Sequence, residues 1–196
     1  MNKVREFEYE IAHFYNAPYA VATDCCTHAI ELCLRLQNPV AVTCPNHTYA
    51  SIPMTFEKLK IQWHFHDIHW KDYYFIGNTN IIDGAVYWKQ NGYLRNTMLC
   101  LSFQFRKHLN IGRGGMILLD NKEQYDQLLK MRYDGRTDDK PWAEQDIDTL
   151  GYHYYMTPEQ AELGLEKLKT ARIAEPKQWS SKDYPDLKQM KVFNAK

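Results

Sequence analysis

The chain has 196 residues, a length that suits one domain with a sizeable core. Lysine plus arginine and aspartate plus glutamate both count 24, so the formal net charge is zero. This balance argues against a nucleic-acid partner or an anionic membrane, both of which attract excess positive charge. The sequence has no apolar run long enough to span a membrane, and MNKVREFEYE lacks the apolar core of a signal peptide. We therefore expect small-molecule ligands, no nucleic acid and no membrane.

The cysteines form an odd set in mostly apolar or turn surroundings: Cys25, Cys26, Cys33, Cys44 and Cys100. An odd number in such surroundings is typical of reduced thiols rather than a disulfide framework. The cysteine pattern therefore predicts a cytoplasmic protein.

Apolar periodicity predicts alternating helices and strands along the first half of the chain. In order these are a helix over 2–15, a strand over 19–23, a helix over 28–36, a strand over 39–44, a helix over 49–58 and a strand over 61–68. The second half continues with strands over 80–85, 97–105 and 116–119, a helix over 121–132, a polar loop over 134–142 and a helix that begins at Thr157. From about Pro176 the sequence predicts an irregular tail.

Three features of the first half suit the binding of a planar, anionic ligand. The helix after Cys26 and Thr27 begins with unpaired amides that attract an anion, although simple helix capping is the alternative. Tyr49 follows a buried strand, where an aromatic ring can stack on a ligand or merely pack. Asp83 ends a short apolar strand, where its carboxylate can pair with a protonated ring nitrogen or form a turn before Gly84.

Residues 102–115, SFQFRKHLNIGRGG, place one lysine between two apolar runs. Lys107 stands at the edge of a turn that closes on three glycines: Gly112, Gly114 and Gly115. Partial desolvation between two strands lowers the pKa of an amine and suits it to form a Schiff base. The alternative is a surface lysine in a glycine turn.

Three closely spaced histidines, His64, His66 and His69, raise a different hypothesis. Such a group can bind a metal ion, which would make the chain a metal-binding protein. Exposed or core histidines are the competing interpretation.

Several stretches together resemble the DegT/StrS family of nucleotide-sugar aminotransferases. They are FEYEIAHFYNAPYAVATDCCTHAIEL, CPNHTYAS, IIDGA, SFQFRKHLNIGRGGMILLDN and LGYHYYMTPEQAELGLEKL, in the order the family uses. The resemblance implies a three-layer α/β/α fold with a mostly parallel sheet, like the large domain of aspartate aminotransferase, and pyridoxal 5′-phosphate (PLP) as the cofactor.

By position, the resemblance implies that Lys107 is the Schiff-base lysine, that Asp83 pairs with the pyridine nitrogen and that Tyr49 stacks on the ring. The phosphate would be held by the amides of Cys26 and Thr27 and the hydroxyls of Thr27 and Ser102. A partner subunit would contribute the segment around His153, so a homodimer is implied.

The chain is shorter than family members in two places, which predicts a smaller sheet and a reduced carboxyl-terminal region. A strand and helix before the Asp83 strand are expected to be missing, and residues 176–196 would replace a separate small domain after an aminotransferase-like domain over 1–175. The implied reaction transfers an amino group from an amino acid, expected to be glutamate, to a keto nucleotide-sugar. A catalytically degenerate homologue that binds PLP or a sugar nucleotide without turnover is the alternative.

Overall fold

The computed structural model describes residues 2–193. Its helices are α1 (Lys3–Tyr15), α2 (Cys26–Gln37), α3 (Ser51–Leu59), α4 (Lys122–Met131) and α5 (Pro158–Ala171), with 3-10 turns at Trp142–Glu144, Ser181–Asp183 and Leu187–Gln189. Its strands are β1 (Tyr19–Thr23), β2 (Ala41–Pro45), β3 (Gln62–His66), β4 (Tyr74–Phe75), β5 (Ile81–Asp83), β6 (Met98–Ser102) and β7 (Gly115–Leu119). Within residues 2–193, no helix combines the length and the apolar character that a membrane span requires.

The strands form a five-stranded sheet in the order β1-β7-β6-β5-β4 and a separate pair, β2-β3. Strand β5 runs parallel to β6, and β2 runs parallel to β3, whereas β1-β7, β6-β7 and β4-β5 are antiparallel. The expected mostly parallel sheet is therefore wrong, because the sheet is mixed and mostly antiparallel. Strands β4 and β5, and likewise β6 and β7, are joined directly without a crossover helix, and such connections reverse the strand direction.

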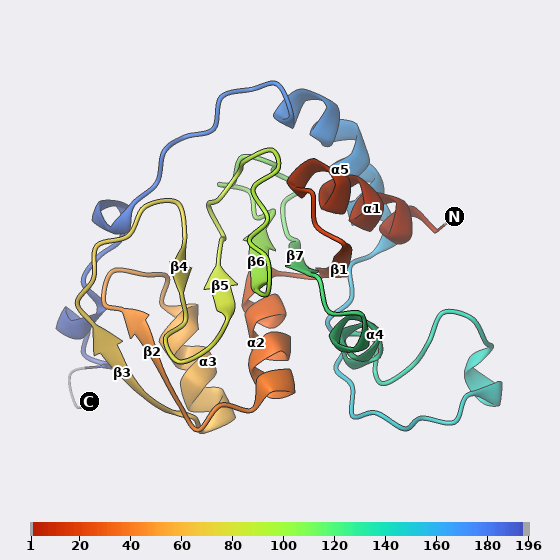
Figure 1. Cartoon of the computed structure of the whole chain (residues 1–196), viewed down its shortest axis with the longest axis horizontal. Helices are drawn as coiled ribbons and strands as arrows, with labels where there is room; N and C mark the ends of the chain where they lie inside the picture. Colours follow the sequence, from red (N-terminus) through yellow and green to blue (C-terminus); the bar gives the residue numbers. More distant parts are fainter. Residues whose placement is uncertain (1, 194–196) are drawn as a thin grey trace.

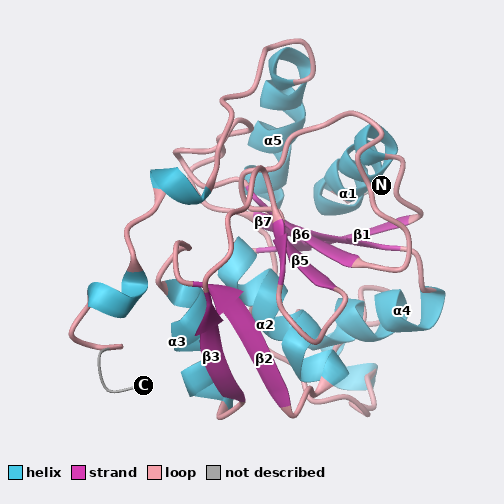
Figure 2. Cartoon of the chain, turned by 60° about the vertical axis from the view of Figure 1, so that its left-hand side comes forward, coloured by secondary structure: helices cyan, strands magenta, loops and turns pink. Residues whose placement is uncertain are grey.

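Helices cover both faces of the sheet, so the expected three layers are confirmed (Figures 1 and 2). Alternate strand residues face opposite sides: Leu99 and Leu101 join a buried cluster with α1 and α5, whereas Met98 and Cys100 join another with α2, α3 and α4. This alternation follows from the two-residue period of a strand.

Polar side chains fix the ends of the outer helices. The Asn2 side chain accepts a hydrogen bond from the Val4 amide at 3.0 Å, and α1 ends where Asn16 takes the left-handed conformation at φ 58°. Thr157 and Gln160 form a capping box at the start of α5, as the Thr157-Pro158 sequence indicates. Helices α1 and α5 lie side by side on one face of the sheet, where Gly164 of α5 packs against the Phe7 ring of α1 (Figure 1).

The carboxyl ends of three strands lie at one edge of the five-stranded sheet. Strand β1 is antiparallel to β7, which is antiparallel to β6, and β6 is parallel to β5. Thr23, Asp83 and Ser102 therefore end their strands at the same edge. Side chains that the sequence separates widely meet there.

After α5 the chain runs as an irregular segment across to the β2-β3 pair (Figure 1). At its far end the Phe193 ring packs 6.1 Å from the Trp63 ring and 5.7 Å from the Phe65 ring, centroid to centroid. The tail is irregular, as expected from the sequence. The division into a domain over 1–175 and a tail stays a prediction.

Candidate active site

Lys107 lies in the connection between β6 and β7. Hydrogen bonds from the Phe103 amide to the Gly114 carbonyl, at 2.9 Å, and from the Phe105 amide to the Gly112 carbonyl, at 3.1 Å, close this hairpin. Gly112 has a φ of 84°, a left-handed conformation that glycine adopts readily. Burial lowers the pKa of the Lys107 amine, and the nearby carboxylate of Asp83 opposes that shift. The structure therefore brings together the lysine and the carboxylate that the sequence singled out.

Asp83 ends β5 and is only 6% exposed. Its Oδ1 accepts a hydrogen bond from the Ala85 amide at 2.9 Å, and its Oδ2 accepts one from the Tyr74 hydroxyl at 2.5 Å. Burial raises the pKa of Asp83, while these hydrogen bonds and the charge of Lys107 act in the opposite direction. The carboxylate is held in one orientation.

Tyr74 was not identified from the sequence as a site residue. It is 5% exposed on β4, directly opposite Asp83 in the β4-β5 register. Its hydroxyl also lies 2.5 Å from the Thr48 hydroxyl, so Thr48, Tyr74 and Asp83 form one buried hydrogen-bond chain. Only the pairing of β4 with β5 makes this contact visible, and β4 is too short to show a sequence pattern.

The start of α2 approaches the end of β7 very closely. A β-carbon added to Gly115 would lie 2.6 Å from the Cys26 amide nitrogen and 2.4 Å from the Cys25 carbonyl carbon. Gly115 is paired with Ser102 on one side and with Thr23 on the other, so only a glycine lets the helix start sit above these strand ends. Ser102 and Cys26 are thereby brought to the same edge of the sheet.

The first turn of α2 has the features of an anion site. Its N-cap residue, Cys25, makes no side-chain capping hydrogen bond, so no side chain of the described residues caps the first amides. Burial raises the pKa of the Cys26 thiol well above its ordinary value, which leaves its amide as the group suited to an anion. The Thr27 hydroxyl lies 2.8 Å from that of Ser51, a residue that the sequence analysis missed.

An ion-pair cluster lies beside this helix start. The Asp24 carboxylate contacts His28 Nδ1 at 2.6 Å and Arg113 Nη2 at 2.7 Å. Burial alone would lower the pKa of His28, but its hydrogen bond with Asp24 raises that pKa to about 9. Asp24, Cys25 and His28 have potential metal-ligand atoms within 4.8 Å of one another. We assign the group as an ion-pair cluster because two cations already neutralise its carboxylate.

The three histidines of the metal hypothesis, His64, His66 and His69, form no comparable group of ligand atoms in the described part of the chain. His69 Nδ1 instead lies 3.4 Å from the Ser181 hydroxyl. The metal hypothesis therefore receives no support from the geometry.

Two further predicted site residues, Tyr49 and His153, are exposed rather than buried like Asp83. Tyr49 stands in the turn before α3 rather than in the helix, and it is 64% exposed. His153 is exposed, and its Nδ1 lies 2.9 Å from an Asp134 carboxylate oxygen. His153 therefore does not join the group around Lys107 within one chain.

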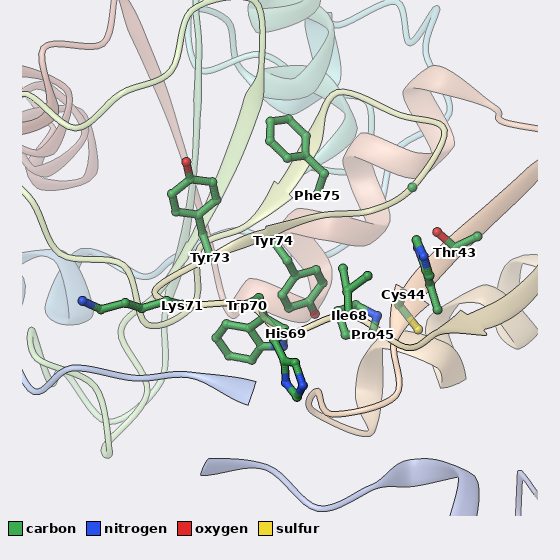
Figure 3. A pocket seen from close by; sticks show the side chains of 12 residues that line it. Thr43, Cys44, Pro45, Ile68, His69, Trp70, Lys71, Tyr73, Tyr74 and Phe75 are labelled. Atoms are coloured by element: carbon green, nitrogen blue, oxygen red, sulfur yellow. The ribbon is translucent and has the colours of Figure 1, made fainter. Parts of the chain in front are cut away.

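A cavity of about 490 Å³ lies between β2 and β4, where the two sheets meet. Tyr73 and Phe75 point to one side of β4, and Tyr74 points to the other with Trp70 and Ile68 nearby (Figure 3). The cavity is lined by Thr43, Cys44, Pro45, His66, Ile68, His69, Trp70, Lys71, Tyr73, Tyr74, Phe75 and Gly77. It therefore adjoins the hydroxyl that holds Asp83.

Three solved structures illustrate the similarity of the fold to that of known proteins. AtS13 from Actinomadura melliaura matches with a TM-score of 0.76 and 21% identity, over 87% of this chain and 60% of that one. The sugar aminotransferase CalS13 from Micromonospora echinospora matches with a TM-score of 0.70 and 15% identity, over 87% of this chain and 61% of that one. The PLP-form of Spr1654 from Streptococcus pneumoniae matches with a TM-score of 0.72 and 19% identity, over 86% of this chain and 59% of that one. The chain thus spans about 60% of the length of these proteins and shares their fold.

Comparison with curated protein sequences gave no match. The model of the DegT/DnrJ/EryC1/StrS aminotransferase family, however, matches residues 1–81 and 82–180. These two ranges cover nearly the whole chain and contain Lys107, Asp83 and the start of α2. The chain belongs to the DegT/DnrJ/EryC1/StrS aminotransferase family.

Proposed function

We propose that this chain is a PLP-dependent aminotransferase that moves an amino group from glutamate to a keto nucleotide-sugar. The family is one of PLP-dependent sugar aminotransferases, which supports this chemistry. The observation that carries the proposal is the desolvated Lys107 amine close to the buried carboxylate of Asp83.

The residues present fit PLP. Lys107 offers an amine with a lowered pKa, Asp83 offers a buried carboxylate, and the approach of Gly115 to the start of α2 leaves uncapped amides for a phosphate. When bound, PLP supplies a ring that stores the electron pair released when a proton leaves the amino-acid carbon.

Each residue then has a defined task in the proposed reaction. The neutral Lys107 amine would take the proton from the α-carbon of the amino acid and return it to the carbon on the other side of the amino nitrogen, a 1,3-shift that a lowered pKa favours near neutral pH. Asp83 keeps the ring nitrogen protonated, and Tyr74 fixes the carboxylate that does so. Tyr49 would stack on the ring.

The phosphate would be bound by the amides of Cys26 and Thr27 and by the hydroxyls of Thr27 and Ser102. His153 would reach the phosphate of a second subunit, so we propose a homodimer; the exposure of the His153 side chain supports that role. We also propose a cytoplasmic location, supported by the five free cysteines.

PLP titration tests the proposal. The wild-type protein should develop an absorbance band near the edge of the visible range, and borohydride reduction should fix the label on Lys107 in a peptide map. Lys107→Ala should lose both, whereas a control, Lys89→Ala at an exposed lysine, should retain them. Wild-type protein with no band, or a label on other lysines only, would refute the assignment of Lys107.

A degenerate homologue that binds PLP or a sugar nucleotide without turnover is the second candidate. The observation that favours it is that the chain spans about 60% of the length of the proteins whose fold it shares, so groups that orient the substrate in those proteins can lie outside the part that this chain matches. Addition of glutamate distinguishes the two functions. The aminotransferase converts the bound cofactor to its pyridoxamine form, whereas the degenerate homologue leaves the band unchanged.

A further inference from the structure

The carboxyl-terminal tail passes directly over the Lys107 amine. Lys107 Nζ lies 5.4 Å from the centroid of the Trp179 ring, a distance at which a cation and an aromatic face attract each other. Lys177 Nζ lies 3.7 Å from the same centroid. Trp179 is therefore the tail residue in contact with the proposed Schiff-base lysine.

A second tail residue, Tyr184, extends this contact toward Asp83. The Tyr184 ring packs 6.2 Å from Trp179 and 5.4 Å from Trp70, and the Trp70 ring packs 5.2 Å from Tyr74, all between centroids. Burial raises the pKa of Tyr184, and the negative charge of Asp83 raises it further, which places the phenol near the carboxylate. The rings thus form a continuous aromatic path from the amine to the carboxylate.

Hydrogen bonds on both sides of these rings tie the tail to the body. The Asp72 amide donates to the Trp179 carbonyl at 2.9 Å, and His47 Nδ1 lies 2.9 Å from the Tyr184 carbonyl oxygen. Just beyond, the Leu187 amide donates to the Asn46 carbonyl at 2.9 Å, and the Leu187 side chain is fully buried. Trp179 and Tyr184 are therefore held in position by the loops after β2 and β3.

We propose that Trp179 and Tyr184 form one wall of the cofactor site and screen the Lys107 amine from water. A wall of two rings removes water from one side of the amine and offers aromatic surface to a planar ligand. The identity of that ligand as PLP rests on the proposed function, whereas the screening of the amine is a property of the protein alone.

Chemical labelling of the PLP-free protein tests the screening without the cofactor. The rate at which trinitrobenzenesulfonate modifies Lys107 is measured against pH by peptide mass spectrometry, with the exposed Lys89 as the internal reference. At high pH the amine is fully neutral, so the plateau rate reports access and the midpoint reports the pKa. Trp179→Ala should raise the plateau several-fold, because the reagent and water then reach the amine.

Two further variants separate screening from loss of folding. Trp179→Phe keeps an aromatic wall and should stay close to wild type, and Trp142→Ala, at a tryptophan that is 62% exposed, should have no effect. Circular dichroism confirms that each variant is folded. An unchanged Lys107 plateau in folded Trp179→Ala, or an equal rise in Trp142→Ala, would overturn the proposed wall.

A PLP titration then separates this inference from the proposed function. In a PLP-binding protein, Trp179→Ala and Tyr184→Ala should each weaken PLP binding several-fold, and Trp142→Ala should not. If wild-type protein shows the screening but binds no PLP, the proposed function fails and the wall stands as a shield for the amine. If PLP binds equally well to wild-type protein and both tail variants, the wall is not part of the cofactor site.

Discussion

Replacing Tyr74 by phenylalanine tests the buried hydrogen-bond chain that holds the candidate carboxylate. The change removes only the hydroxyl, which donates to Asp83 Oδ2 at 2.5 Å and lies 2.5 Å from the Thr48 hydroxyl. Because Tyr74 and Asp83 are 5% and 6% exposed, water does not readily replace the lost partner. A buried hydrogen bond to a charged group contributes about 1.5–3 kcal/mol, so we expect Tyr74→Phe to lower the free energy of unfolding by about 2 kcal/mol near pH 8.

The loss should depend on pH, and its sign follows from the pKa of Asp83. Burial raises that pKa above its unfolded value, so the folded state binds the proton more tightly and stability falls as pH rises between the two values. Since the Tyr74 hydroxyl opposes this shift, its removal raises the folded pKa further and widens the window. Tyr74→Phe should therefore cost more stability at pH 8 than at pH 5.

Urea unfolding at both pH values measures this effect, and Tyr73→Phe is the matched control. Tyr73 is the neighbouring, half-buried tyrosine, and its hydroxyl has no protein hydrogen-bond partner within residues 2–193. An equal loss at pH 5 and pH 8, or a loss no larger than that of the control, would refute the reasoning about Asp83.

Three other changes probe the surroundings of the site. Gly115→Ala adds a β-carbon 2.4 Å from the backbone at the start of α2. PLP affinity should therefore fall by about tenfold, or ~1.4 kcal/mol, in an absorbance titration, and unchanged affinity would contradict the phosphate assignment. Arg132→Met removes the buried partner of Glu8 while Arg5 still contacts that carboxylate. Urea unfolding should show that the free energy of unfolding falls by about 3 kcal/mol, and an unchanged value would contradict the pairing. The pKa of His28 is raised to about 9, so its stabilising contribution is complete below pH 6.5 and is lost as pH rises through 9. In thermal unfolding, His28→Gln should remove this pH-dependent loss of stability. A variant with the same pH profile as wild type would contradict the assignment to His28.

The element pattern could be predicted from the sequence because each element carries a local signal. Val4, Phe7 and Ile11 follow helical spacing on α1, and the Thr157-Pro158 pair marks the start of α5. The sheet direction could not be predicted in this way, because pairing depends on contacts between distant segments. The expectation of a mostly parallel sheet came from the family resemblance and is wrong at three pairs of neighbouring strands, β1-β7, β6-β7 and β4-β5.

The candidate site likewise contains residues that local sequence marks and residues that only the tertiary structure identifies. Asp83 ends a strand and Lys107 lies in a glycine-rich connection between two strands, where the local sequence marks them, and the charge of each acts on the pKa of the other. Tyr74, Trp179 and Tyr184 lie in segments with little regular structure, so nothing in their local sequence indicates that they approach the site. Only tertiary packing assigns them.

The connection between α3 and β5 shapes the candidate site. Among the described residues, no helix lies between α3 and β5, and β4 pairs with β5 as an antiparallel hairpin. That a strand and a helix of the family are missing here stays a prediction. Directly opposite residues of such a pair project to the same face, so the hairpin places Tyr74 next to Asp83. A crossover helix would run β4 parallel to β5 and would not impose that register. The direct connection between β4 and β5 therefore provides Asp83 with its hydrogen-bond donor, and this hairpin is part of the candidate site.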